Sequence, residues 1–253
     1  MDIVIIGSGN VATVVGRKIR AAGHRIIQVF SRQKDHASIL ASLLDAKPIH
    51  AFDELEKSDV ILLAVPDNAY NAIIEELPFM NSLLIHTAGS LPMDILKSRS
   101  ARYGVLYPLQ TLRRELEIIP DLPLLIDANE EKTLLELKTF AAGLSKTVIH
   151  ANNEARLKYH LAAVIVSNFT NHLFALTEEY CQKEKISFAL LQPLMEETVH
   201  RLKEDSAAVL QTGPAVRNDT QTLQKHRELL KKYTELLPLY DALTRSIQRG
   251  IMR

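Results

Sequence analysis

The stretch IVIIGSGNVA, residues 3–12, decides how the first half of this chain folds. Residues 3–6 form a continuous apolar run, as expected for a parallel strand buried on both faces of a sheet. The next six residues match the pattern G-x-G-x-x-A, and a helical pattern then continues to a stop at Gly23. A glycine-rich turn between a strand and a helix is the context in which this pattern binds a dinucleotide.

The turn itself supplies the predicted phosphate-binding residues. We expect the first glycine to make the tight turn and the second to let the backbone approach a diphosphate closely. The diphosphate would then lie on the unpaired N–H groups at the N-terminus of the following helix. The residues predicted to bind the phosphates are Gly7, Ser8, Gly9, Asn10 and Val11.

The choice between the two nicotinamide cofactors is made at the end of the second predicted strand, residues 26–30. An NAD-binding protein usually has Asp or Glu there, roughly 20 residues after the glycine turn, to bind the ribose 2′-hydroxyl. This chain has Ser31 and Arg32 instead. Arg32 can pair with a 2′-phosphate through two N–H groups and Ser31 can donate a hydrogen bond, whereas an acid would repel the phosphate. The sequence therefore predicts NADP(H) in preference to NAD(H), and the missing acid also counts against a methyltransferase.

Further strands alternate with helices over the first 150 residues, and the pattern after that point is helical throughout. We therefore predict an α/β fold, with a Rossmann-type, mostly parallel sheet in an NADP-binding domain at 1–150 and an all-α domain at 151–253. Residues that follow the strands at 60–65 and 82–86 would lie at the ligand-binding edge of this sheet. The additional cofactor contacts predicted from that position are Ala64, Val65, Pro66, Thr87 and Ala88.

Composition excludes several classes of function. The 253 residues include 30 basic and 30 acidic side chains, so no net charge attracts nucleic acid or an anionic membrane. The one cysteine, Cys181, cannot form a disulfide within the chain. No signal peptide, membrane-spanning run, clustered metal ligands, nucleophile elbow or Walker loop is visible, so we expect a cytoplasmic protein that acts on a small molecule without a metal.

Several motifs resemble those of known oxidoreductases. The opening motif at residues 6–12 is similar to that of pyrroline-5-carboxylate reductases and of NADP oxidoreductases that use a deazaflavin coenzyme. The strings HTAGS (86–90), YPLQT (107–111), SNF (167–169) and TGPAVRND (212–219) resemble an oxidoreductase family in which a Rossmann-like domain precedes a helical domain of unknown function, DUF2520. The resemblance covers nearly the whole chain.

The resemblance implies an architecture and a cofactor. The family's helical domain is similar to the C-terminal domain of 6-phosphogluconate dehydrogenase and its relatives, which often dimerise through it. It therefore implies NADP as the cofactor, a homodimer formed through the helical domain, and a small polar substrate in an interdomain cleft. It implies no particular substrate.

The acid–base residues of the wider dehydrogenase group cannot be copied directly. That group often has a Lys-x-x-x-Asn pair on the first helix of the second domain, but the residue four positions before Asn168 is Val164. His160 suits proton donation because an unperturbed histidine pKa of about 6.5 lies near working pH. The candidate catalytic residues are His160, Asn168 and Tyr107, although the family more commonly has His at the position of Tyr107, and His86 is an alternative donor.

A helix predicted over residues 155–176 carries three of the relevant polar side chains. It is mostly apolar on every side, which is typical of a buried central helix. His160, Ser167 and Asn171 fall on one stripe of it at 3.6 residues per turn. We expect this stripe to face a substrate cleft, a second subunit or solvent.

The first functional hypothesis is an NADPH-dependent reductase or dehydrogenase that transfers a hydride to or from a small polar metabolite. The second is a non-catalytic NADP(H) sensor, which the missing lysine favours. The third is an isomerase that regenerates its dinucleotide. Turnover of NADPH discriminates the first two, because the sensor would bind the cofactor tightly without consuming it.

Overall fold

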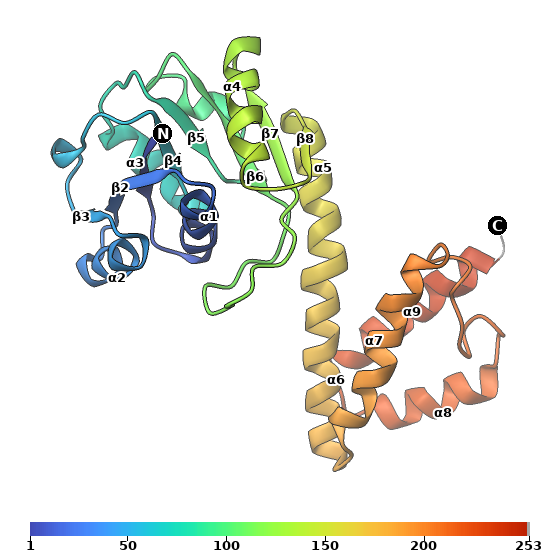
Figure 1. The fold of residues 1–253 in the computed structure, drawn as a ribbon. Coiled ribbons are helices and arrows are strands. Elements are labelled where there is room, and N and C mark those ends of the chain that lie inside the picture. The colour runs from blue at the N-terminus through green and yellow to red at the C-terminus, as the bar shows by residue number, and fades with distance from the viewer. Residues whose placement is uncertain (252–253) are drawn as a thin grey trace. The chain divides into compact units, whose positions relative to one another are not determined.

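A computed structural model describes residues 1–251 of the chain, which divides into two compact units, Met1–Ser167 and Asn168–Arg253. The first unit contains every strand of the described residues, and the second is helical (Figure 1). The last strand ends at His150, so the strands stop where the sequence predicted, while the helix that follows still belongs to the first unit. No helix among residues 1–251 has the length and apolar character needed to cross a membrane.

The first unit is built on one eight-stranded sheet in the order β3-β2-β1-β4-β5-β6-β7-β8. Every neighbouring pair is parallel except β6 and β7, which are antiparallel. This confirms the predicted Rossmann-type, mostly parallel sheet. The strands are β1 (Asp2–Ile6), β2 (Arg25–Phe30), β3 (Lys47–Ile49), β4 (Val60–Leu63), β5 (Leu83–His86), β6 (Tyr103–Pro108), β7 (Leu124–Ala128) and β8 (Val148–His150).

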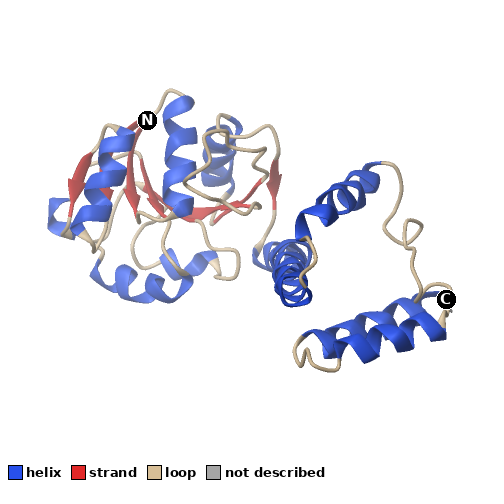
Figure 2. Cartoon of the chain, turned by 90° about the horizontal axis from the view of Figure 1, so that it is seen from below, coloured by secondary structure: helices blue, strands red, loops and turns tan. Residues whose placement is uncertain are grey.

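Helices cover both faces of this sheet (Figure 2). Ile3 and Ile5 of β1 belong to one buried cluster and Val4 and Ile6 to another, because successive side chains of a strand point to opposite faces. Residues of α1, α2 and α4 pack in the first cluster, and residues of α3 and η3 pack in the second. In chain order, the helices of this part of the first unit are α1 (Asn10–Ala21), α2 (Lys34–Leu44), η1 (Phe52–Glu54), η2 (Asp67–Ala69), α3 (Tyr70–Glu76), η3 (Met93–Leu96) and α4 (Glu131–Ala142).

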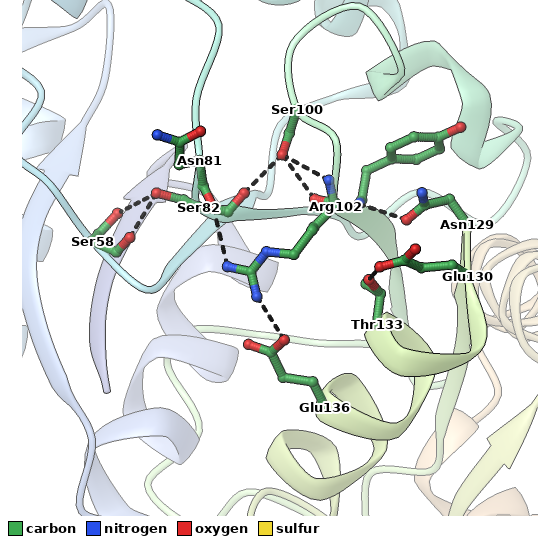
Figure 3. A network of polar contacts seen from close by, with 10 residues as sticks. Ser58, Asn81, Ser82, Ser100, Arg102, Asn129, Glu130, Thr133 and Glu136 are labelled. Atoms are coloured by element: carbon green, nitrogen blue, oxygen red, sulfur yellow. Dashed lines mark hydrogen bonds and ion pairs between the residues drawn. The ribbon is translucent and has the colours of Figure 1, made fainter.

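The amino-terminal edge of the sheet is held by a polar network (Figure 3). Ser100 donates to the carbonyl of Ser82 over 2.8 Å, and Ser82 donates to the carbonyl of Ser58 over 2.6 Å. Arg102 forms an ion pair with Glu136 of α4 at 2.7 Å and also donates to the backbone of the loop before β5. These bonds satisfy the polar groups of three neighbouring loops, so this edge has a structural role.

The rest of the chain is helical. Asn152 caps α5 by accepting from the N–H of Ala155, and Asp219 caps α8 by accepting from the N–H of Thr222. Asn218, the residue before the Asp219 cap, has φ +52° and lies outside the helix. The elements are α5 (Asn153–Ala163), the π-helix η4 (Val164–Phe169), α6 (Thr170–Glu184), η5 (Phe188–Leu191), α7 (Gln192–His200), η6 (Arg201–Lys203), α8 (Thr220–Leu230) and α9 (Leu236–Ile251).

The helical segment that starts at Asn153 is not the buried central helix that the sequence predicted. Its side chains Leu157, Leu161 and Val166 are 50%, 59% and 72% exposed in the single chain. The π-helix also changes the spacing, because each of its turns holds more than the 3.6 residues assumed for the predicted stripe. An apolar pattern on every side of a helix therefore does not by itself show that the helix is buried within its own chain.

Candidate dinucleotide site

A cavity of about 670 Å³ lies at the carboxyl ends of the parallel strands of the first unit. This is the edge at which open α/β sheets bind their ligands, and the volume is in the range of cofactor sites. The cavity is lined by all twelve residues predicted to bind the cofactor: Gly7, Ser8, Gly9, Asn10, Val11, Ser31, Arg32, Ala64, Val65, Pro66, Thr87 and Ala88.

The two glycines of the turn have different surroundings. Gly7 has φ +124°, and a Cβ placed there would lie 2.1 Å from the carbonyl oxygen of Ala64. A Cβ placed on Gly9 would meet no atom of residues 1–251 within 4 Å, so the cavity side of Gly9 is open. Ala12 is fully buried in the core, which agrees with close packing of α1 on the sheet. The residues present therefore fit a dinucleotide, because the turn is tight where the protein packs and open where a diphosphate would approach.

The N-terminus of α1 is left free for an anion. Gly9 is the N-cap, no side chain caps the helix, and no acidic residue lies in the first turn. The unpaired N–H groups and the helix dipole both favour negative charge at this point. Ser8 lies between the two glycines of the turn, and its hydroxyl donates to the Oγ of Ser31 over 2.9 Å. This bond connects the loops that follow β1 and β2.

Arg32, the predicted partner of a 2′-phosphate, lies beside the same cavity. It lines the cavity at the end of β2, and its guanidinium lies 3.6 Å from the carboxylate of Glu76. Both side chains are more than half exposed, so the pair is weak and a bound phosphate can compete for Arg32. The N–H of Gln33 bonds to the Oγ of Ser31 over 3.3 Å, which fixes the backbone beside Arg32.

Two predicted catalytic residues meet in the same cavity. The hydroxyl of Tyr107, on β6, lies 2.9 Å from Nδ1 of His160, on α5, and both side chains line the cavity. Burial raises the pKa of the Tyr107 hydroxyl, and the carboxylate of Asp67 raises it further, while the Arg156 cation opposes both. Tyr107 therefore stays protonated at neutral pH and can donate a proton.

Gly89 provides the space for this pair. A Cβ placed on Gly89 would lie 2.8 Å from Nδ1 of His160 and 3.0 Å from Cε2 of Tyr107. The turn that follows β5 is thus packed directly against both side chains.

Comparisons with known proteins agree with this geometry. A family model described as "NADP oxidoreductase coenzyme F420-dependent" matches residues 2–89, and a model described as "Domain of unknown function (DUF2520)" matches residues 122–247. The chain is 34% identical to a Bacteroides fragilis protein assigned to the NADP oxidoreductases, with 98% of each chain covered and a TM-score of 0.89. The chain belongs to this NADP oxidoreductase family. No curated protein matches it.

More distant structures share the fold of this chain. A Thermotoga maritima protein is 23% identical over 99% of this chain and 100% of its own, with a TM-score of 0.82. A reductive aminase from Aspergillus terreus, solved with NADPH and ethyl-5-oxohexanoate, is 15% identical over 98% of this chain and 95% of its own, with a TM-score of 0.71.

His86 is not suited to be the alternative proton donor that the sequence suggested. Its ring is fully buried and does not line the cavity. Burial and the nearby Arg156 cation lower its pKa to about 3, so the ring is neutral at physiological pH. Its Nδ1 accepts the N–H of Ala88 over 3.1 Å. His86 therefore holds the turn after β5 in place, and its neutral ring is too weak an acid to serve as a general acid.

Asn168, the third catalytic candidate, is exposed and is not among the residues that line the cavity. It lies in the π-helix, next to Ser167, whose hydroxyl is 2.9 Å from that of Thr111. Its proposed role in orienting a substrate stays a prediction. Ser167 contacts the loop after β6 and His160 contacts β6 itself, so two members of the predicted stripe face the sheet within the first unit.

Sequence reasoning missed several polar residues of the cavity. Gln33 and His36 follow Arg32 and could have been found from their position after β2. Asp67 follows Pro66, and its carboxylate accepts from the hydroxyl of Ser90 over 2.5 Å. Arg114 had no such signal, because it comes from a long loop whose course a sequence pattern does not reveal.

Proposed function

We propose that this chain is an NADPH-dependent reductase that reduces a C=O or C=N bond of a small polar metabolite beside Tyr107 and His160. The observation that carries the proposal is the 2.9 Å hydrogen bond between these two side chains inside the cavity lined by the glycine turn. A protonated donor and a dinucleotide site in one cavity are the two components that such a reduction requires.

The bound reduced nicotinamide would supply the hydride. As negative charge develops on the substrate's oxygen or nitrogen, the hydroxyl of Tyr107 donates its proton to that atom. The phenolate that remains is stabilised by the hydrogen bond from His160 when Nδ1 carries a proton, and a proton passed through this ring restores the hydroxyl. Arg156, whose positive charge favours ionisation of Tyr107, assists the same step.

Consumption of NADPH in the presence of carbonyl compounds, imines and an oxidised deazaflavin tests the proposal. We expect turnover with at least one of these classes, and a loss of roughly 100-fold in kcat for Tyr107→Phe, as is typical when a general acid is removed. Tyr159→Phe is the matched control, because Tyr159 is the neighbour of His160 but is exposed and does not line the cavity. Tight binding of NADPH without turnover of any class would favour the sensor instead.

Preference for NADP(H) is tested separately by thermal shift. A ligand that binds only the native state raises the melting temperature, and the increase grows with affinity. We expect a larger increase with NADPH than with NADH at equal concentration. A larger increase with NADH would contradict the role proposed for Arg32.

We also propose that the protein forms a homodimer through its helical part. The second unit buries few apolar side chains, whereas Leu190, Leu194, Val199 and Leu202 are between 52% and 80% exposed. So small a core supports an independent fold poorly, and a second copy would supply the missing contacts. Large apolar side chains that are exposed in this number within one short segment are typical of an interface between subunits.

A further inference from the structure

The loop at residues 109–123, between β6 and β7, crosses from the sheet to α1, and we call it the strap. Its base is closed by two hydrogen bonds, from the N–H of Leu109 to the carbonyl of Pro123 over 2.9 Å and from Gln110 to the carbonyl of Asp121 over 3.3 Å. Leu112 and Leu122 are buried in the core that contains α1. The strap is therefore a packed part of the first unit, although much of its tip is exposed.

Arg17 of α1 fixes the far side of the strap. Its guanidinium donates to the carbonyl of Leu116 over 2.6 Å and to that of Glu117 over 2.9 Å. Arg17 lies two turns after the N-terminus of α1, where the dinucleotide diphosphate is expected. The strap is thus bonded to the same helix that forms the phosphate site.

Two adjacent arginines of the strap, Arg113 and Arg114, differ in whether they line the cavity. Arg113 and Arg114 both lie near the carboxylate of Glu115, at 3.9 Å and 3.3 Å, and both are more than half exposed. Only Arg114 lines the cavity. The contact between Arg114 and Glu115 joins neighbouring exposed residues, so it holds Arg114 weakly.

The glycine turn offers a diphosphate hydrogen-bond donors but no cation. Residues 7–13 contain no lysine or arginine, and Arg32 stands at the end of a different strand, where the 2′-phosphate is expected. We propose that Arg114 supplies this cation and pairs with the diphosphate of the dinucleotide from the strap. The assignment rests on the proposed dinucleotide site, and it gives the two arginines separate phosphates to bind.

Titration of NADPH and NADH into the full-length protein tests the assignment. Because both dinucleotides contain the diphosphate, Arg114→Gln should raise both dissociation constants by a similar factor, about tenfold at low salt. Arg32→Gln should raise the constant for NADPH alone. Arg113→Gln, the matched control, should change neither by more than about twofold, as expected for an exposed arginine whose nearest ion pair is weak.

Added salt provides a second readout, because ions screen an exposed pair. The penalty for Arg114→Gln should shrink as the salt concentration rises. Equal binding by Arg114→Gln and Arg113→Gln would overturn the assignment, as would a penalty seen with NADPH only, which would place Arg114 at the 2′-phosphate. A wild-type protein that binds neither dinucleotide would instead overturn the dinucleotide site itself.

Discussion

At the scale of single residues, the two glycines of the phosphate turn make opposite demands. Gly9→Ala adds a methyl group on the open side of the turn, where no protein atom lies within 4 Å. Its φ of −85° suits alanine, so we expect the free energy of unfolding to change by less than about 1 kcal/mol. The methyl group should nevertheless keep the diphosphate away, and the dissociation constant for NADPH should rise at least about tenfold, measured by titration.

Gly7→Ala is the contrasting change in the same turn. Its Cβ would collide with the carbonyl of Ala64, and its φ of +124° is strained for any other residue. We expect a loss of at least about 1–3 kcal/mol of stability, measured by urea denaturation. Similar stability for Gly7→Ala and Gly9→Ala would contradict this account of the turn.

The buried ring of His86 predicts how stability depends on pH. In the unfolded chain its pKa is near the ordinary value of 6.5, whereas in the folded chain it is about 3. Between these values the unfolded state binds the extra proton, so stability falls as pH is lowered through this window, by up to about 1.4 kcal/mol per pH unit. His86→Asn keeps an acceptor for the N–H of Ala88 without a titrating ring. It should therefore reduce the slope of the free energy of unfolding against pH between about pH 4 and about pH 6, a range that lies inside this window.

Urea unfolding of both proteins at several pH values measures this slope. Acidic residues elsewhere contribute equally to the two proteins, so the difference between them isolates His86. Identical slopes would show that His86 is protonated in the folded state.

Residues of the site could be predicted from sequence where the information is local. Gly7, Gly9 and Arg32 were found because each lies at a fixed place after a strand. The hydrogen bond between Tyr107 and His160 joins residues 53 apart in the chain, and no spacing rule reveals it. Both were named from their chemistry and from the family resemblance, and only the fold shows that they form a pair.

At the scale of elements, the strap depends on the two hydrogen bonds from Arg17. Arg17→Ala removes both bonds to the backbone of Leu116 and Glu117, so the strap should open more often. Arg113 and Arg114 are trypsin sites that lie just before this anchor. We expect cleavage at these sites to become several-fold faster, followed by mass spectrometry of the fragments.

Arg20→Ala controls for the loss of an arginine from α1, because the one polar contact of the Arg20 side chain among the described residues is an exposed ion pair with Asp45 at 3.7 Å. This variant should be cleaved in the strap at the wild-type rate. Equal rates for the Arg17 and Arg20 variants would show that packing of Leu112 and Leu122 holds the strap without Arg17.

The elements themselves were largely predictable, because apolar runs and helical spacing are local signals. The predicted strands of the first unit are all present, within one or two residues at most ends. Two features were missed for physical reasons. The antiparallel pairing of β6 with β7 depends on the course of the strap, and the π-helix Val164–Phe169 has no sequence signature distinct from an α-helix.

At the scale of the whole molecule, the exposed apolar side chains of the second unit predict a dimer. Leu194 of α7 is 65% exposed, and Leu135 of α4, in the first unit, is 67% exposed. Because the two leucines are equally exposed, a substitution of Leu135 is a matched control for one of Leu194. Leu194→Glu should convert the dimer to a monomer, because a charge buried in an apolar interface loses its hydration. Leu135→Glu should leave the dimer intact.

Light scattering after gel filtration measures both masses, and melting temperatures at several protein concentrations add a second test. A dimer is stabilised by mass action, so the wild-type melting temperature should rise with concentration, whereas that of Leu194→Glu should not. A wild-type protein that is monomeric at tens of micromolar would leave these leucines exposed to water and contradict the dimer. Loss of the dimer in both variants would instead place the interface on the first unit as well, because only a contact at α4 makes Leu135 sensitive to charge.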